Sequence, residues 1–166
     1  MRIVMAGIAW TGLYVASKVI YAMEGELGVT GGPQVSPDSY LAYGPGEVAL
    51  AQWGNVAAGA VIIAILLAGR IRFTGRLPYL VVLWAHGVCT AVAAVGAAGM
   101  TGGALLTDRG GAVFGAYCAV WAVLLFLATR DMRRGHHARR PLGEHRAKSG
   151  GRAPARYQKI GDVQER

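Results

Sequence analysis

The chain has 166 residues, 54% of them hydrophobic, with a mean hydropathy of +0.37 and a formal net charge of +8 at pH 7. Its apolar residues are gathered in four blocks, which is typical of a membrane protein and argues against a soluble globular domain. The two cysteines, Cys89 and Cys118, fall inside apolar blocks and imply no disulfide framework.

The positive charge is concentrated in the C-terminal part of the chain. Residues 1–129 hold six Lys or Arg and five Asp or Glu, whereas residues 130–166 hold eleven and four. We therefore divide the chain into a transmembrane domain, residues 1–129, and a basic tail, residues 130–166. The tail contains much Arg, Gly, His and Pro and little apolar sequence, which predicts disorder.

The first apolar block, residues 3–23, predicts a retained membrane helix. A cleaved signal peptide is the alternative, but the residues before plausible cleavage points are poorly suited to it. Residues 24–47 then contain four acids and no Lys or Arg, which predicts a loop on the outer side. Within this loop, Ser36 and Pro37 predict the start of a one- or two-turn surface helix, with Tyr40 and Tyr43 on one side.

The next two blocks, residues 48–69 and 78–100, are each long enough to cross a hydrocarbon layer of about 30 Å. Between them lie Arg70, Arg72 and Arg76, and such basic turns are enriched on the cytoplasmic side. The arginines therefore predict a cytoplasmic turn between two membrane helices.

The fourth block, residues 111–129, follows a predicted outer loop at residues 101–110. Gly111, Gly115 and Ala119 recur at intervals of four residues in this block, a pattern typical of helix contacts in membranes. Four crossings place all the basic segments on one side. The sequence thus predicts an all-α fold, an integral membrane antiparallel four-helix bundle in the cell membrane, with both termini cytoplasmic and a disordered basic C-terminal tail.

One charged residue, Lys18, lies well inside an apolar block, where a charge is costly and often functional. A lysine near a helix end also has a structural explanation, because its ammonium can reach the interface. Other polar residues are expected at similar depth, and they form either an outward-facing pocket or a mutually bonded structural network. The candidate polar cluster comprises Lys18, Tyr14, Tyr21, Glu24, Gln52, Asn55 and Tyr117.

His86 is expected near the middle of the third helix, as a proton-relay group or as a hydrogen-bonded core residue. His136, His137 and His145 in the tail are a weak basis for metal binding, and we predict no metal site and no cofactor. The chain contains no Walker loop, Gly-x-Ser-x-Gly or His-Glu-x-x-His motif, so nothing in it supports an enzyme.

Several short motifs resemble a family of small four-helix bacterial membrane proteins known only as a domain of unknown function. They are Ser17-Lys18, Glu24-Gly25-Glu26-Leu27-Gly28, Gly32-Pro33 and Gln52-Trp53-Gly54-Asn55. The resemblance covers roughly residues 5–130. It implies four helices, draws attention to Lys18, Glu24 and Asn55, and supplies no activity.

The favoured function is that of a non-enzymatic multi-pass membrane protein acting through helix packing, as a homo-oligomer or with an unknown membrane partner. The alternative is a small-molecule or ion carrier that uses the polar cluster around Lys18. The tail is expected to contact anionic headgroups of the lipid bilayer, and nucleic acid is a less favoured partner. The contact residues would be Arg130, Arg133, Arg134, Arg139 and Arg140.

Overall fold

The computed structural model describes residues 2–71, 73–107 and 109–137. Four long helices account for most of them: α1 (Arg2–Glu24), α2 (Glu47–Ala68), α3 (Arg76–Leu106) and α4 (Ala112–His137). A short 3-10 helix, η1 (Pro37–Ala42), lies in the loop between α1 and α2, within the segment where a surface helix was predicted. Helices make up 80% of the described residues, none of which forms a strand. The prediction of an all-α chain with four helices long and apolar enough to cross a membrane is confirmed.

Two helices are longer than predicted. Helix α3 continues from the expected end at Met100 to Leu106, so much of the predicted 101–110 loop is helical. Helix α4 continues through residues 130–137, which were predicted to belong to the disordered tail. The half-buried Met132 and His136 extend the buried face of α4 at helical spacing from Ala128, and the intervening arginines are good helix formers. The rest of the predicted tail, residues 138–166, lies outside the described residues.

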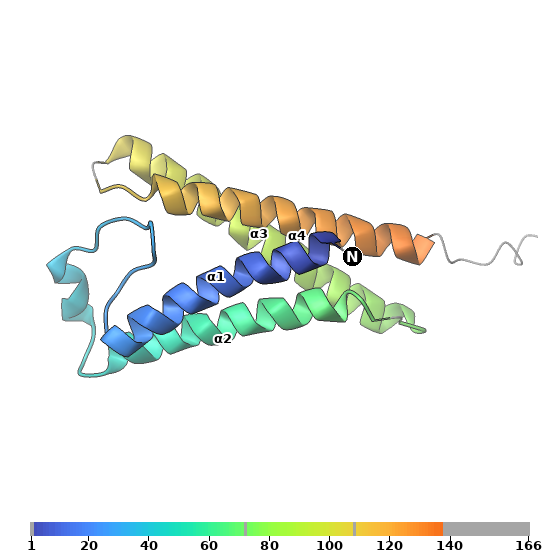
Figure 1. Cartoon of the computed structure of the whole chain (residues 1–166), viewed down its shortest axis with the longest axis horizontal. Coiled ribbons are helices and arrows are strands. Elements are labelled where there is room, and N and C mark those ends of the chain that lie inside the picture. The colour runs from blue at the N-terminus through green and yellow to red at the C-terminus, as the bar shows by residue number, and fades with distance from the viewer. Residues whose placement is uncertain (1, 72, 108, 138–166) are drawn as a thin grey trace, which may run out of the picture.

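The helices are arranged as two pairs, α1 with α2 and α3 with α4 (Figure 1). The pairs are joined mainly by contacts of α1 with α4, whereas α2 and α3 touch little. Glycines allow close approach within each pair. A Cβ on Gly59 of α2 would lie 2.5 Å from Cγ2 of Val15 in α1, and one on Gly115 of α4 would lie 2.6 Å from Oγ1 of Thr101 in α3.

The predicted small-residue pattern of the fourth helix is therefore only partly an interface between helices. Gly115 packs against α3 as expected, but Gly111 precedes α4 at φ +99° and lies against Pro33 of the α1–α2 loop. Ala119 is exposed. The three residues recur every four positions in the sequence, but they do not pack against the same element.

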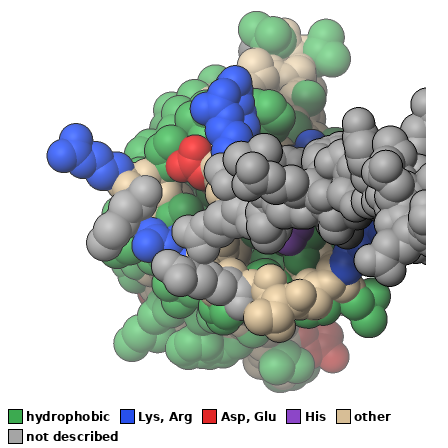
Figure 2. Space-filling view, turned by 90° about the vertical axis from the view of Figure 1, so that its right-hand side faces the viewer, with side chains coloured by type: hydrophobic (Ala, Val, Ile, Leu, Met, Phe, Trp, Pro, Cys, Tyr) green, Lys and Arg blue, Asp and Glu red, His purple; other side chains and the backbone are tan. Residues whose placement is uncertain are grey.

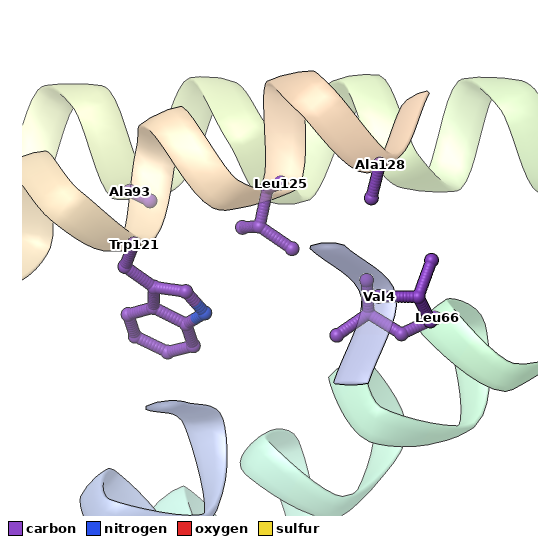
Figure 3. Packing of buried hydrophobic residues seen from close by; sticks show 6 residues of the cluster. All are labelled: Val4, Leu66, Ala93, Trp121, Leu125 and Ala128. Atoms are coloured by element: carbon purple, nitrogen blue, oxygen red, sulfur yellow. The ribbon is translucent and has the colours of Figure 1, made fainter. Parts of the chain in front are cut away.

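Residues from all four helices meet in a small apolar core. Val4 of α1, Leu66 of α2 and Ala93 of α3 lie with three residues of α4, namely Trp121, Leu125 and Ala128 (Figure 3). Most other large apolar side chains face outward, such as Leu13, which is 60% exposed, and Trp84, which is 72% exposed. A soluble protein of this size rarely exposes so much apolar surface, whereas a lipid environment favours it.

The α1–α2 loop has a defined path. Helix α1 is followed by Gly25, whose φ of +67° is readily adopted by glycine, and the Glu26 N–H donates to the Tyr21 carbonyl as in a Schellman cap. Further along, the Gln34 N–H donates to the Arg109 carbonyl. The Gly31 carbonyl accepts from Phe114 N–H in the first turn of α4. The loop is thus fastened to both the α3–α4 turn and α4.

Charged residues divide between the two ends of the molecule. The start of α1, the α2–α3 turn and the end of α4 lie toward one end, and the α1–α2 loop and the α3–α4 turn lie toward the other (Figure 1). We call the first of these the basic end, because exposed Arg side chains surround it (Figure 2). Its described arginines are Arg2, Arg70, Arg76, Arg130, Arg133 and Arg134. The opposite end, which we call the acidic end, carries Glu24, Glu26, Asp38 and Glu47 together with one arginine, Arg109, and the basic end also includes Asp131.

Candidate functional site

The polar residues of α1 and α2 meet near the acidic end of the molecule. Lys18 is 8% exposed, and its Nζ donates to Oε1 of Gln52 at 2.9 Å and to the Gly28 carbonyl at 2.6 Å. Nζ also lies 5.8 Å from the centre of the Tyr14 ring, within the range of a cation–π contact. The structure thus brings together Lys18, Gln52 and Tyr14, three residues singled out in the sequence.

Gln52 connects the other members of this cluster. It is 2% exposed, and its Nε2 donates to the carbonyls of Glu26 at 2.8 Å and Gly28 at 3.2 Å. Asn55, one turn later on α2, donates to Oε1 of Gln52 at 3.3 Å. We call Lys18, Gln52, Asn55 and the carbonyls of Glu26 and Gly28 the Lys18–Gln52 cluster. The Lys18 ammonium and both polar atoms of the Gln52 amide therefore form hydrogen bonds within this cluster.

The cluster holds a positive charge without a carboxylate. Among the described residues, no Asp or Glu forms an ion pair with Lys18, and its described hydrogen-bond partners are neutral oxygens. Carbonyl and amide dipoles therefore offset part of the cost of burying the ammonium. Chemically, the arrangement fastens the loop to two helices, because one ammonium and one amide bridge α1, α2 and residues 26–28.

Two of the candidate residues, Glu24 and Tyr117, lie elsewhere, and a third, Tyr21, only borders the Lys18–Gln52 cluster. Glu24 is exposed at the end of α1, and its carboxylate has no partner among the described residues. Tyr21 packs against Gly28, where a Cβ would lie 3.3 Å from Cε1 of the tyrosine. Tyr117 bonds to Trp10 instead of joining the Lys18–Gln52 cluster. The candidate cluster is therefore smaller than expected.

Tyr117 belongs to an aromatic contact that joins α1 and α4. Its ring stacks on Trp10 with centroids 4.9 Å apart, its hydroxyl donates to the Trp10 carbonyl, and Trp10 Nε1 donates to the Tyr117 carbonyl at 3.2 Å. Nearby, Trp121 Nε1 donates to Oγ1 of Thr11 at 3.0 Å, and that hydroxyl donates to the Gly7 carbonyl at 2.8 Å. These bonds fix the rotation of α1 against α4.

The sequence did not reveal these contacts, nor a further attachment of the loop to α1. The hydroxyls of Ser17 and Thr30 lie 2.8 Å apart, and Thr30 N–H donates to the Ser17 hydroxyl at 3.1 Å. Trp10 and Thr11 were visible as polar groups in an apolar helix, but their partners depend on how the helices are rotated. The carbonyls of Glu26 and Gly28 carry no sequence signal as acceptors.

His86 lies apart from the Lys18–Gln52 cluster, where α3 meets α2 toward the basic end. It is 1% exposed, and its Nε2 is 3.1 Å from the Ile65 carbonyl. The close packing of the His86 ring against α2 requires a glycine at position 69, since a Cβ there would lie 2.8 Å from Nε2. Nδ1 is buried without a described hydrogen-bond partner. The histidine therefore bridges two helices that otherwise touch little.

The remaining candidate residues belong to the C-terminal part of the chain. Arg130, Arg133 and Arg134 are exposed on α4, and Arg139 and Arg140 lie outside the described residues. His136 stacks on Tyr79 of α3, with ring centroids 3.8 Å apart. No group of three His, Cys, Asp or Glu side chains within residues 2–71, 73–107 and 109–136 could hold a metal ion. His145 lies outside the described part of the chain.

Comparison with known proteins adds no assignment. No family model, curated protein or solved structure matches the chain. The resemblance to small four-helix bacterial membrane proteins therefore stays an expectation.

Proposed function

We propose that the chain is a multi-pass protein of the cell membrane, folded as an antiparallel four-helix bundle with both termini cytoplasmic. Three features support this proposal: the length of the apolar helices, the outward-facing apolar side chains and the separation of charge between the two ends. The antiparallel order is supported by contacts such as those of Gly7 with Leu66 and Val15 with Gly59, which run in opposite directions along α1 and α2. By the positive-inside rule, the basic end is cytoplasmic.

Within this membrane protein, the polar residues serve structure rather than catalysis, and the outward helix faces serve contacts with partner proteins or with further copies. The observation that carries this proposal is the closed Lys18–Gln52 cluster. Its ammonium and amide are almost fully buried and bonded to one another and to loop carbonyls. Such bonds between helices typically contribute about 0.6 to 2 kcal/mol each, enough to hold a loop and a helix register in place.

A carrier for a small molecule or an ion is the second candidate function. It is favoured by the buried Lys18 ammonium, which lacks a carboxylate partner among the described residues. An unneutralised cation inside a membrane protein can attract an anionic substrate. This function requires that the cluster open to water, whereas the structural role requires that it stay closed.

Accessibility to a small, charged, thiol-reactive reagent separates the two functions. Asn55 is suited to the test, because it is half-buried and its side chain makes one described bond, at the margin of the cluster. In intact cells, Asn55→Cys should not react from outside, whereas Tyr43→Cys in the exposed loop should react. Rapid labelling of Asn55→Cys would favour the carrier and contradict the closed cluster.

Partner contacts are tested by photo-crosslinking in native membranes. A photoreactive amino acid at Trp84, which faces outward on α3, should give a defined protein adduct, either with a second copy or with a partner. The matched control is Ala93 on the same helix, which is 6% exposed and faces the core. Lipid adducts alone at Trp84 would contradict an interface on this face.

The basic C-terminal part of the chain is proposed to contact anionic headgroups. Arginines near a membrane surface each gain about 1 kcal/mol from anionic lipid, and the gain falls off over about 8 to 10 Å at physiological salt. The residues are Arg130, Arg133, Arg134, Arg139 and Arg140. The attraction is expected to weaken as salt rises.

A further inference from the structure

The basic segment after the fourth apolar block begins as a helix rather than as a flexible tail. Helix α4 continues to His137, past the last residue of the apolar block, Thr129. We call residues 130–137 the α4 extension. At about 1.5 Å per residue, it adds roughly 10 to 12 Å to the helix, which is enough to cross one headgroup layer.

The α4 extension has two different faces. Met132 and His136 are half-buried and lie four residues apart in line with the buried Ala128, so this face continues toward α3. Arg130, Arg133 and Arg134 are exposed and share the opposite side at spacings of three and four residues. Along the helix axis, they fall within about 6 Å of one another, because each residue rises about 1.5 Å.

These three guanidinium groups are available for binding. None has a hydrogen-bond or ion-pair partner among the described residues, although Asp131 is their neighbour in sequence. A guanidinium presents a planar set of donors that matches two oxygens of a phosphate group. The face therefore offers clustered and unpaired phosphate donors.

A contact with α3 holds the extension in position. The ring of His136 stacks on Tyr79, with centroids 3.8 Å apart and planes inclined by 12°. Tyr79 is buried near the start of α3, beside the arginine-containing turn. The extension is thus packed against the bundle, so its backbone is already ordered and binding has to order only the arginine side chains.

We propose that the α4 extension is a preformed docking surface for anionic phospholipid headgroups, bound chiefly through Arg130, Arg133 and Arg134. The proposal rests on the membrane placement proposed above, because Thr129 then marks the hydrocarbon boundary and the three arginines lie at the depth of the phosphates. It differs from binding by a flexible tail, since it places the recognition on a helix face at fixed spacing. Phosphatidylglycerol, with one net negative charge, has the required chemistry.

The sequence offers a matched pair of variants for the test. Arg133 and Arg134 form an Arg-Arg dipeptide in the α4 extension, and Arg139 and Arg140 form another six residues later. The variants R133Q/R134Q and R139Q/R140Q remove the same charge from the full-length chain. The measurement is the thermal unfolding midpoint in a neutral detergent as phosphatidylglycerol is added, from which an apparent lipid dissociation constant follows.

The docking surface predicts unequal effects of the two variants. R133Q/R134Q should weaken phosphatidylglycerol binding about 30-fold, at roughly fivefold per arginine, whereas R139Q/R140Q should weaken it less than about threefold. Phosphatidylcholine and inorganic phosphate at matched ionic strength should give no comparable stabilisation. Equal losses in the two variants, a larger loss in R139Q/R140Q, or equal stabilisation by phosphate would overturn the proposal.

This experiment is independent of orientation in the membrane. A chain with the opposite topology would still show the predicted lipid preference in detergent, and labelling from each side of the membrane would then reveal the topology. Failure of the docking surface and failure of the membrane placement are therefore separate results.

Discussion

The Nζ of Lys18 on α1 and the Oε1 of Gln52 on α2 form a buried hydrogen bond of 2.9 Å. Gln52 simultaneously donates to the carbonyls of Glu26 and Gly28, so the same two side chains hold the loop that connects their helices. The described partners of the Lys18 ammonium are carbonyl and amide dipoles, and none of them is a carboxylate. Removing the Gln52 side-chain amide alone should therefore destabilise the protein more than removing both the amide and the Lys18 ammonium.

This relationship predicts that a second substitution, at Lys18, partly restores the stability lost by substituting Gln52. Gln52→Leu should lower the free energy of unfolding by about 2 kcal/mol, because the Lys18 ammonium stays buried with one of its two acceptors. The double variant K18M/Q52L should recover about 1 kcal/mol of that loss, since no charge is then stranded. Denaturant unfolding in mixed micelles measures the free energy of unfolding of both variants. A double variant no more stable than Gln52→Leu would show that the stranded charge is not the cause.

The close approach of α1 and α2 predicts opposite effects for two glycines of one helix. Gly59→Ala should destabilise the protein by about 1 to 3 kcal/mol, because the added methyl meets the stiff Val15 side chain at 2.5 Å. Gly54→Ala adds its methyl to open space and should stabilise α2 by up to about 1 kcal/mol. Thermal unfolding of the two variants compares them. Equal effects would mean that the helices do not approach at Gly59.

The contact between Thr11 and Trp121 predicts an energetic coupling between α1 and α4. Thr11→Val and Trp121→Phe each remove the 3.0 Å hydrogen bond, so together they should cost less than the sum of the two. The expected coupling is about 0.6 to 1.7 kcal/mol, the range found for hydrogen bonds between membrane helices. Strictly additive losses would place the two residues out of contact.

The surroundings of His86 predict its tautomer. The Ile65 carbonyl can only accept, so Nε2 must carry the proton, and Nδ1 is then an unprotonated acceptor with no described partner. Nitrogen-15 NMR of histidine-labelled protein at neutral pH should show a protonated Nε2 and a bare Nδ1. A resonance pattern of the opposite tautomer would rule out the bridge between α2 and α3.

The sequence predicted the number and approximate positions of the helices well, because uninterrupted apolar length is a local property. Helix ends were less predictable. The Gly-rich stretch after Met100 suggested a loop but continues as α3, and Arg130 suggested the start of disorder but lies within α4. In both places, local composition was a poor guide to where the helix ends.

For the candidate site, the sequence identified Lys18, Gln52 and Asn55 but not the groups that complete it. The Glu26 and Gly28 carbonyls are brought to Gln52 by the path of the loop after Gly25, which no side-chain pattern encodes. Tyr117 was expected in the cluster because of its depth. Depth does not specify rotation about the helix axis, and the rotation of α4 directs Tyr117 to Trp10.

The placement of this chain across a membrane, with its basic end inside, is tested most directly by sided cysteine labelling. In intact cells, a membrane-impermeant maleimide should label Ser39→Cys in the η1 segment and should label Ser149→Cys only after the cells are opened. The unsubstituted chain is the control, because its cysteines, Cys89 and Cys118, lie within the apolar segments of α3 and α4. Labelling of both positions from the same side of the membrane would contradict the account.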